Sequence, residues 1–401
     1  MALIVMKFGG SSVADTQRLY RVAERITNTY KEGNDVVVVL SAQGDTTDEL
    51  IAKAEDVNLN GSKREMDMLL ACGEQMSVAL EAMAIQRLGC PVVSLNAWQV
   101  GIHTDSRYSG ARIRRVDASR IRMELDRKRI VLVTGFQGIS PDGDLTTLGR
   151  GGSDTSAVAL AVALKADLCQ IFTDVDGVYT ADPRLVSNAK KLQEITYDEM
   201  LELASLGAQV LHNRSVQMAK RYHVDLEVLT SFANVPGTIV KEVVKMEKVI
   251  ISGVAKDCSI ARIALVGLNN EPGVAYQLFS LLAKKKIDVD VILQSIGRGD
   301  SKDISFTVDL ADCDEAAAVL EANRDELGFD HLDVRKDVAK VSIVGGGMLN
   351  TPGIAAAMFQ ALYEEHINIQ MISTSEIKVS VLIDKAQADR AVRAIHSKFF
   401  D

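Results

Sequence analysis

Two hydrophobic periods alternate over roughly the first 230 residues of the chain, and this alternation constrains the fold more than any other feature. Short apolar runs such as ALIVMKF (2–8) and DVVVVL (35–40) are typical of strands that are buried on both faces. Between them, five residues recur at helical spacing before Gly33, a predicted C-cap: Leu19, Val22, Ala23, Ile26 and Tyr30. The same pattern predicts helices over 63–88, 117–128 and 153–165, and strands over 90–95, 130–136 and 168–175. We therefore expect an α/β domain with an open, mainly parallel sheet sandwiched by helices.

Length and composition restrict the remaining possibilities. A chain of 401 residues suggests two or three domains, and a net charge of -9 argues against nucleic acid or an anionic membrane as the main partner. We find no run of 18 apolar residues and no signal-peptide pattern, so we expect a cytoplasmic protein without a membrane span. Five scattered cysteines and six histidines without ligand spacing predict reduced thiols and no protein-held metal.

The chain changes character after residue 234. A turn signal, NVPG (234–237), precedes a charged stretch, KEVVKMEK (241–248), so we place one domain at 1–234 and a second region at 249–401. In the second region, EPGVAYQLFSLLAKKKIDVDVILQS can be aligned with TPGIAAAMFQALYEEHINIQMISTS at a constant offset of 80 residues. Two copies are too few for a solenoid, so a duplicated small α+β module is the better interpretation.

The turn Lys7-Phe8-Gly9-Gly10 is the first candidate for chemistry. Glycines let the main chain approach a ligand closely, and the start of the following helix favours anions. Lys7 adds a positive charge, so the turn is suited to hold a phosphate, although it is not the P-loop motif. A tight turn with a solvated lysine remains an equally good explanation of this segment alone.

Two further segments strengthen the functional interpretation. TTLGRGGSDTSA (146–157) leads directly into a predicted helix, and its Arg150 is suited to bidentate capture of a carboxylate or phosphate. Asp154 in the same segment is either functional or simply an N-cap. FTDVDGVYTADPR (172–184) is either a nucleotide loop or an acidic surface loop. Each segment follows a predicted strand, which is where ligands bind in open α/β sheets.

Taken together, these segments resemble the amino acid kinase family, and within it the aspartate kinases. The resemblance rests on KFGGSSV, SAQGDTTDEL (41–50), Gly73-Glu74, GFQG, TTLGRGGSDTSA and FTDVDGVYTADPR, which occur in the family's order. The C-terminal repeat resembles that family's paired ACT domains. The resemblance implies an amino acid kinase fold followed by two ferredoxin-like ACT domains, at about 260–337 and 338–401. In this family the first module is often inserted in the second, so a strand over 249–256 would belong to the second.

The resemblance implies phosphoryl transfer from ATP, with Mg²⁺, to the side-chain carboxylate of L-aspartate. The implied catalytic residues are Lys7, Gly9, Gly10 and Asp154. Aspartate would be bound by Ser41, Thr46, Thr47, Glu74, Arg150, Gly151, Gly152, Ser153 and Asp154. The nucleotide would be bound by Lys7, Phe8, Gly9, Gly10, Thr173, Asp174, Tyr179, Asp182, Arg184 and Gln209. Many relatives have a lysine where this chain has Gln209, which leaves the phosphate site with one cation fewer.

The resemblance also implies feedback regulation by lysine, threonine or both, and a homo-oligomer formed through the ACT domains. Effector contacts are expected at Gly273, Val274, Ala275, Asp288, Gln294, Ile354, Ala355, Asn368, Ile369, Ser375 and Glu376. The Pro-Gly helix starts of the repeat could take a carboxylate, and Asp288 or Glu376 an ammonium; the same strands could equally be purely structural. Met246, at the domain boundary, could start a shorter ACT-only subunit.

Two other classes of protein are compatible with parts of this pattern. A non-catalytic amino acid sensor with a degenerate kinase domain would explain Gln209. A dinucleotide-dependent oxidoreductase could also carry ACT domains, but no G-x-G-x-x-G follows a predicted strand. Turnover of ATP with aspartate distinguishes the kinase from the sensor.

Overall fold

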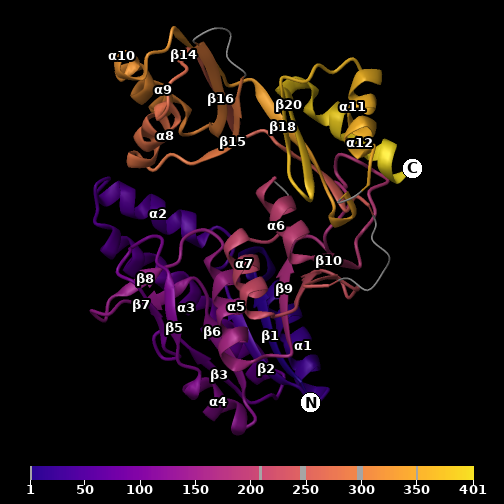
Figure 1. Cartoon of the computed structure of the whole chain (residues 1–401). Helices are drawn as coiled ribbons and strands as arrows, with labels where there is room; N and C mark the ends of the chain where they lie inside the picture. Colours follow the sequence, from indigo (N-terminus) through magenta and orange to yellow (C-terminus); the bar gives the residue numbers. More distant parts are fainter. Residues whose placement is uncertain (1, 207–209, 244–249, 296–300, 349–350) are drawn as a thin grey trace. The chain divides into compact units, whose positions relative to one another are not determined.

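The computed structural model describes residues 2–206, 210–243, 250–295, 301–348 and 351–401 (Figure 1). The chain forms two compact units. The first contains residues 2–178, 191–205 and 210–243, and the second contains 179–190, 206 and the described residues from 250 onward. The short segment Tyr179–Lys190 therefore leaves the first unit and folds with the second.

An eight-stranded sheet is the centre of the first unit, in the order β10-β12-β11-β9-β1-β2-β6-β3. Its strands are β1 (Leu3–Phe8), β2 (Asp35–Leu40), β3 (Val92–Leu95), β6 (Ile130–Thr134), β9 (Leu168–Thr173), β10 (Glu194–Thr196), β11 (Leu226–Thr230) and β12 (Thr238–Lys241). All neighbours are parallel except β11 and β12. The predicted mainly parallel sheet is confirmed, and the apolar runs of β2 and β6 are buried on both faces.

Helices cover both faces of this sheet. They are α1 (Thr16–Lys31), α2 (Thr46–Val57), α3 (Lys63–Arg87), α4 (Ser119–Asp126), α5 (Gly152–Leu164), α6 (Tyr197–Ser205) and α7 (Asn213–Tyr222). α1 and α3 pack on the face that presents Met6 and Phe8. α5 contacts β1, β2 and β9, and its Asp154 reaches Lys7, whose side chain points to the other face.

Among the described helices, α3 alone has the length and apolarity needed to cross a membrane. However, 56% of its most apolar window is buried inside the chain. It also carries Asp67, Glu74 and Glu81 on its buried side. These features identify α3 as a core helix of the first unit.

A second, four-stranded sheet in the first unit was not predicted. It has the order β5-β4-β7-β8 and consists of β4 (Ile102–Thr104), β5 (Ile113–Val116), β7 (Gln137–Ile139) and β8 (Leu145–Thr147). The glycine segment around Arg150 follows β8 of this small sheet. Each segment was expected to follow a predicted strand; the strand before this segment, β8, was not predicted and belongs to the small sheet.

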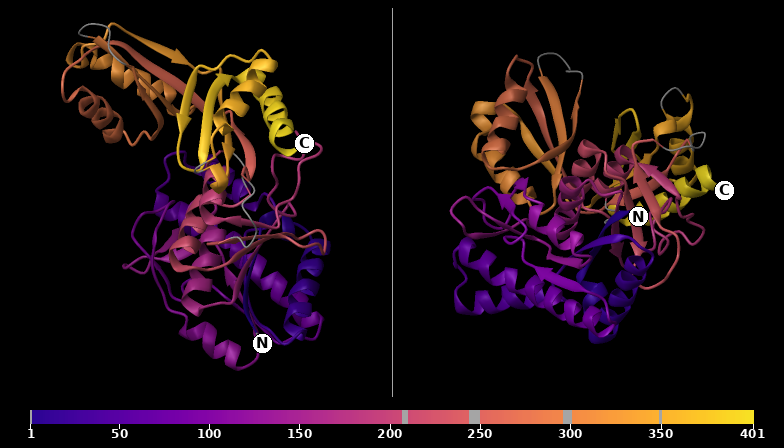
Figure 2. Two further views of the ribbon diagram at one scale, coloured as in Figure 1. Left: turned by 45° about the vertical axis from the view of Figure 1, so that its right-hand side comes forward. Right: turned by 90° about the horizontal axis from the view of Figure 1, so that it is seen from below.

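Two four-stranded antiparallel sheets make up most of the second unit, each with helices against one face (Figure 2). One has the order β15-β16-β14-β17, from β14 (Ile260–Asn269), β15 (Val289–Gln294), β16 (Ser301–Asp309) and β17 (His331–Arg335), with α8 (Val274–Lys284), α9 (Cys313–Ala322) and α10 (Arg324–Leu327). The other has the order β13-β18-β20-β19, from β13 (Gly253–Asp257), β18 (Val338–Val344), β19 (Met371–Thr374) and β20 (Lys378–Asp384), with α11 (Ile354–Glu364) and α12 (Ala388–Phe400). The predicted pair of α+β modules is confirmed.

The chain order of these strands shows how the modules are connected. β13 pairs antiparallel with β18, with Gly253 opposite Val344 and Asp257 opposite Lys340. The first module, β14 to β17, therefore lies in the chain between two adjacent strands of the second module. This is the pairing that the insertion hypothesis requires.

Candidate active site

The glycine turn after β1 packs directly on the turn after β2. The backbone N–H of Ser41 donates to the carbonyl of Phe8 at 3.1 Å, and that of Gly44 donates to the carbonyl of Gly10 at 3.0 Å. A Cβ atom on Gly10 would lie 2.6 Å from the carbonyl oxygen of Ala42. Only glycine fits there without displacing a backbone, so the two turns form one rigid main-chain surface.

An ion pair connects this surface to the second glycine segment. Lys7 Nζ lies 2.7 Å from Asp154 Oδ1, and both side chains are about nine-tenths buried, with 12% and 11% exposed. The ammonium lies beside the turn, 3.5 Å from where a Cβ atom on Gly9 would be. Lys7 is therefore not the solvated lysine that the turn alone allowed. Asp154 is not an N-cap either, because Gly151 holds that position with a left-handed φ of 66°.

Glu74 of α3 reaches the same turn from the other side. The backbone N–H of Ala42 donates to its Oε1 at 3.2 Å, while Oε2 has no hydrogen-bond partner among the described residues. Burial raises the pKa of Glu74 to about 7. A buried carboxylate oxygen without a donor is costly unless a ligand supplies one. Ser41 is half-buried beside it, as are Thr46 and Thr47 in the first turn of α2.

The main chain around Arg150 is fixed while its guanidinium is not. A Cβ atom on Gly151 would lie 2.2 Å from the ring of His212, and one on Gly152 would lie 2.8 Å from the ring of Phe136. Within the part of the chain that the structure describes, the exposed Arg150 makes no ion pair or hydrogen bond. A cation held on a rigid loop without a partner is suited to bind an anionic ligand.

Two residues that the sequence analysis missed hold this loop in place. Asp67 of α3 is fully buried and accepts hydrogen bonds from the backbone N–H and the hydroxyl of Thr147, at 2.7 and 2.8 Å. Arg214 of α7 donates to the carbonyl of Leu148 at 2.9 Å. The chain is thus anchored from two helices just before Arg150. A signal for Asp67 was present, since it lies seven residues before Glu74 on the same helix face.

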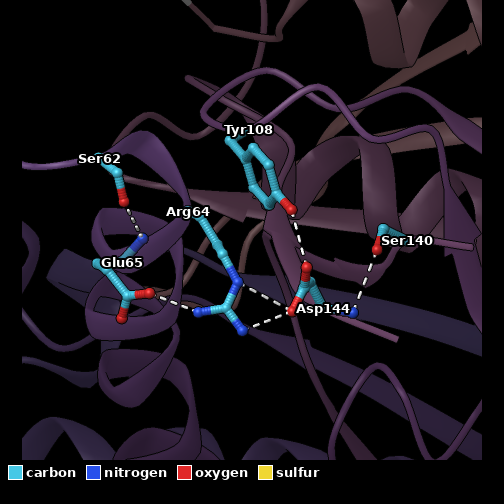
Figure 3. Close-up of polar contacts among 6 residues, drawn as sticks. All are labelled: Ser62, Arg64, Glu65, Tyr108, Ser140 and Asp144. Atoms are coloured by element: carbon cyan, nitrogen blue, oxygen red, sulfur yellow. Dashed lines mark hydrogen bonds and ion pairs between the residues drawn. The ribbon is translucent and has the colours of Figure 1, made fainter. Parts of the chain in front are cut away.

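A polar network attaches the start of α3 to the turn between β7 and β8 (Figure 3). Arg64 donates from Nε to Asp144 Oδ1 at 3.0 Å, and Tyr108 donates its hydroxyl hydrogen to Asp144 Oδ2 at 2.9 Å. The hydrogen bonds from Arg64 lower the pKa of Asp144 below its ordinary value. Ser140 accepts from the backbone N–H of Asp144, and Ser62 caps the helix. The network fixes the end of α3 that carries Asp67.

The predicted nucleotide residues divide between the two units. Thr173 ends β9, and its hydroxyl donates to Asp174 at 2.9 Å. Tyr179, Asp182 and Arg184 lie on Tyr179–Lys190, which folds with the second unit. There Arg184 Nη2 pairs with Asp182 Oδ2 at 2.8 Å, and its hydrogen bonds lower the pKa of Asp182. Gln209 lies outside the described residues.

The same segment is anchored in the second unit by its own contacts. The carbonyl of Thr180 accepts from the backbone N–H of Val254, and Thr180 Oγ1 lies 2.9 Å from His396 Nε2. Ala181 and Val186 belong to the apolar core of the second module. The segment 172–184 was expected to be one nucleotide-binding loop, but its beginning belongs to the first unit and its end is held by contacts within the second unit.

The repeat places its glycines as its sequence suggested. Gly273 and Gly353 precede α8 and α11 with left-handed φ values of 100° and 94°, and a Cβ atom on either would meet nothing within 4 Å. Five of the expected effector contacts are exposed: Asp288, Gln294, Asn368, Ser375 and Glu376. Five others pack at least partly into the two module cores: Val274 and Ala275 in the first, Ile354, Ala355 and Ile369 in the second.

The sequence profile of the amino acid kinase family matches residues 2–230, and that of the ACT domain matches residues 263–323 and 341–399. An aspartokinase of Bacillus sp. (strain MGA3) is 48% identical over 400 residues, covering 100% of this chain and 97% of that protein. The crystal structure of E. coli aspartokinase III in complex with aspartate and ADP is 26% identical, with a TM-score of 0.83 and complete coverage of both chains. The same enzyme in complex with lysine and aspartate gives a TM-score of 0.78 at 27% identity.

Proposed function

The chain belongs to the aspartokinase branch of the amino acid kinase family, and we propose that the Lys7–Asp154 pair and its glycine turns are its catalytic centre. The chain is an ATP-dependent aspartate kinase with ACT regulatory domains, which transfers a phosphoryl group to the side-chain carboxylate of L-aspartate. The product is 4-phospho-L-aspartate. The ion pair carries the proposal, because it brings the two glycine segments to one point.

The acceptor chemistry determines which roles the residues need to play. A side-chain carboxylate has a pKa of about 3.9 and is already ionised at neutral pH, so no general base is required. Phosphoryl transfer then depends on positioning and charge neutralisation. Asp154 and Glu74 bind the α-ammonium of aspartate, and Arg150 binds its α-carboxylate. Ser41, Thr46 and Thr47 line the same site, with the main chain of Gly151, Gly152 and Ser153.

Lys7 changes partner in this mechanism. Before substrate binds, Asp154 holds the lysine ammonium beside Gly9. The α-ammonium of aspartate then replaces Lys7 as the ion-pair partner of Asp154. The Lys7 ammonium instead binds the transferring phosphoryl group, together with the main-chain amides of Gly9 and Gly10. Preorganised donors of this kind stabilise charge that develops in the transition state.

The nucleotide is the remaining substrate. Phe8, Thr173, Asp174, Tyr179, Asp182, Arg184 and Gln209 are the residues proposed to bind ATP. Within the described residues there is no cluster of three acidic, histidine or cysteine side chains that could hold a metal. Magnesium is usually held by phosphates and one or two carboxylates, so Mg²⁺ is proposed to enter with ATP. Bound there, it neutralises charge on the phosphates.

The ACT modules are proposed to bind lysine, threonine or both as feedback inhibitors. The relative solved with lysine supports an amino acid effector. The paired left-handed glycines at the starts of α8 and α11 present free backbone N–H groups to a carboxylate. We further propose a cytoplasmic location and assembly through the ACT modules. Met246, the proposed start of a shorter subunit, lies outside the described residues.

The direct test is turnover with a trap for the product. The purified chain is incubated with ATP and Mg²⁺, with aspartate, glutamate or neither, and acyl phosphate is captured by hydroxylamine as the hydroxamate. We expect product with aspartate and about 10–200-fold less efficient turnover with glutamate, the discrimination available from one methylene. Lysine or threonine binding without any turnover would instead identify a non-catalytic sensor.

A second measurement tests regulation. Initial rates with aspartate are compared in the presence of lysine, threonine and both together. Inhibition by one or both amino acids is expected. Unchanged rates under all three conditions would contradict the proposed effector sites while leaving the kinase activity established.

A further inference from the structure

The GFQG segment (135–138) after β6 forms a tight turn with a strained residue in it. Phe136 has a left-handed φ of 66°, which is rare for a bulky side chain. The backbone N–H of Phe136 donates to Ser156 Oγ at 3.1 Å, and its carbonyl accepts from the backbone N–H of Leu148 at 2.8 Å. Backbone strain that its surroundings maintain in this way is common at functional sites. The residue that follows the strained position is Gln137, whose side chain has no role in the steps proposed for the site.

Gln137 is fully buried, and its hydrogen bonds fix the direction of its amide. The backbone N–H of Ala97 donates to Thr134 Oγ1 at 2.8 Å, so the hydroxyl hydrogen of Thr134 is donated to Gln137 Oε1, at 3.0 Å. On the other side, Gln137 Nε2 donates to the carbonyl of Ala71 at 2.6 Å. A carbonyl can only accept, so both ends of the amide require the same orientation. Nε2 carries two hydrogens, and the bond to Ala71 uses one of them.

The second hydrogen of this amide is available to Glu74. Ala71 and Glu74 are three residues apart, so they lie on the same face of α3. Burial raises the pKa of Glu74 to about 7, and the backbone N–H of Ala42 and the side chain of Gln137 partly oppose this rise. A donor that lowers the pKa of a carboxyl group favours its charged form. Among the described residues Glu74 Oε2 has no hydrogen-bond partner, so one oxygen remains for a ligand.

Among the described residues, no charged side chain is a cause of the pKa of Glu74. The strands β3, β6 and β8 pack on α3 and contain no titratable residue. The charged and titratable groups of the other surrounding elements have their own partners or are exposed: Lys7 of β1 pairs with Asp154 of α5, Asp35 of β2 with Lys128, Asp67 accepts from Thr147, Tyr20 of α1 accepts from Arg87, and Asp48, Glu49 and Arg150 are exposed. Glu81 lies two turns further along α3.

We propose that Gln137 is a positioning residue for the kinase reaction, because its amide donates to Glu74 and holds this carboxylate in the charged state that binds the α-ammonium of aspartate. The inference rests on the substrate-binding role proposed for Glu74. Gln137 is fully buried and acts through Glu74 rather than on the substrate. A cation in its place would also keep Glu74 ionised, but it would compete with the substrate ammonium for the same carboxylate. A neutral amide favours the charge without neutralising it.

The KM for aspartate as a function of pH tests this role in the full-length chain. Gln137→Met removes the donor and keeps a side chain of similar length. A hydrogen bond to a charged group is worth about one pKa unit or more, so the midpoint of the KM profile should move from about pH 7 to about pH 8 or above. Relative to the unmodified enzyme, the KM of Gln137→Met should be at least about fivefold higher at pH 7 and at most about twofold higher at pH 9.

Ser77→Ala is the matched control. It removes another buried polar group, three residues after Glu74 on α3, and should leave the midpoint in place. A loss of packing alone would raise the KM of Gln137→Met by the same factor at every pH. That result, or an unmoved midpoint, would overturn the role of Gln137 while the kinase and Glu74 assignments stand. Failure of the unmodified enzyme to form the hydroxamate, or a KM that does not depend on pH, would instead overturn those assignments and this one with them.

Nuclear magnetic resonance of the unmodified chain tests the contact without relying on the folding of Gln137→Met. With ¹⁵N-labelled glutamine, one side-chain N–H signal should move with pH at the midpoint of the KM profile, because the Gln137 amide senses the charge on Glu74. The same signal should stop moving in Glu74→Gln. If no glutamine side-chain signal has this midpoint, the proposed contact is wrong.

Discussion

The Glu74 carboxylate, whose Oε2 has no hydrogen-bond partner among the described residues, predicts how aspartate binding depends on pH. Burial raises the pKa of this group to about 7, above the value of an exposed glutamate. Its charged form, which attracts the substrate ammonium, is therefore present above pH 7 and lost as the pH falls. The ionised fraction is about 0.9 at pH 8 and about 0.1 at pH 6, since each pH unit is a factor of ten. We expect the KM for aspartate to rise about tenfold from pH 8 to pH 6.

The assay is initial rate against aspartate concentration at saturating ATP, across this pH range. Glu74→Gln has no titrating group at that position, so its KM should be high at every pH and change less than about twofold. Glu81→Gln is the matched control: it removes a second buried glutamate from the same helix, one outside the site, and should keep the full pH dependence. A flat profile in the unmodified enzyme, or an unchanged one in Glu74→Gln, would refute the role of Glu74.

Further substitutions test the other assignments. Lys7→Ala should lower kcat by about 10²–10³, the cost of one preorganised electrostatic group; an unchanged kcat would exclude it from the mechanism. Asp154→Asn should raise the KM for aspartate and leave the pH–rate profile in place, whereas a shifted profile would restore a general-base role. Asp67→Asn replaces an acceptor oxygen by an NH₂ group that faces the N–H and hydroxyl donors of Thr147, which weakens the anchor of the loop before Arg150. The KM for aspartate should therefore rise by a larger factor than kcat falls. Burial raises the pKa of Glu81 to about 9, so the free energy of unfolding of the unmodified chain should fall as the pH rises from 6 to 8. In urea unfolding, the free energy of unfolding of Glu81→Gln should increase relative to that of the unmodified chain by about 1.4 kcal/mol per pH unit over this range.

Hydrophobic periodicity was sufficient to predict the main sheet and its long helices. β2 and β6 are apolar runs that are buried on both faces, and α1 carries an uninterrupted apolar stripe. The small sheet escaped prediction because its strands have three or four residues, too few for a period of two to be recognised. α2 escaped because none of its residues is fully buried, so no core-facing stripe marks it.

The residues of the candidate site were found from local motifs, but their contacts could not be. Lys7 and Asp154 are 147 residues apart in the chain, and only the adjacency of β1 and α5 brings them within 2.7 Å. The motif around Tyr179 looked like a single loop. Its second half folds with the second unit because Ala181 and Val186 make apolar contacts with a core built from about the last 150 residues. No local sequence pattern encodes these contacts.

Helix α3 departs from the usual pattern of a surface helix, because it has acidic residues on its buried side and several apolar residues on its exposed side. Asp67, Glu74 and Glu81 recur every seven residues and would ordinarily face water, yet all three are buried. Asp67 accepts hydrogen bonds from backbone and hydroxyl donors, and the proposed role of Glu74 in binding the substrate ammonium would explain a second buried acid. The buried side also carries apolar residues such as Val78 and Ile85, which pack into the core, while Met76, Leu80 and Met83 are exposed. Glu81 has no hydrogen-bond donor among the described residues and no place in the site, and burial raises its pKa to about 9, so it is mostly protonated at neutral pH.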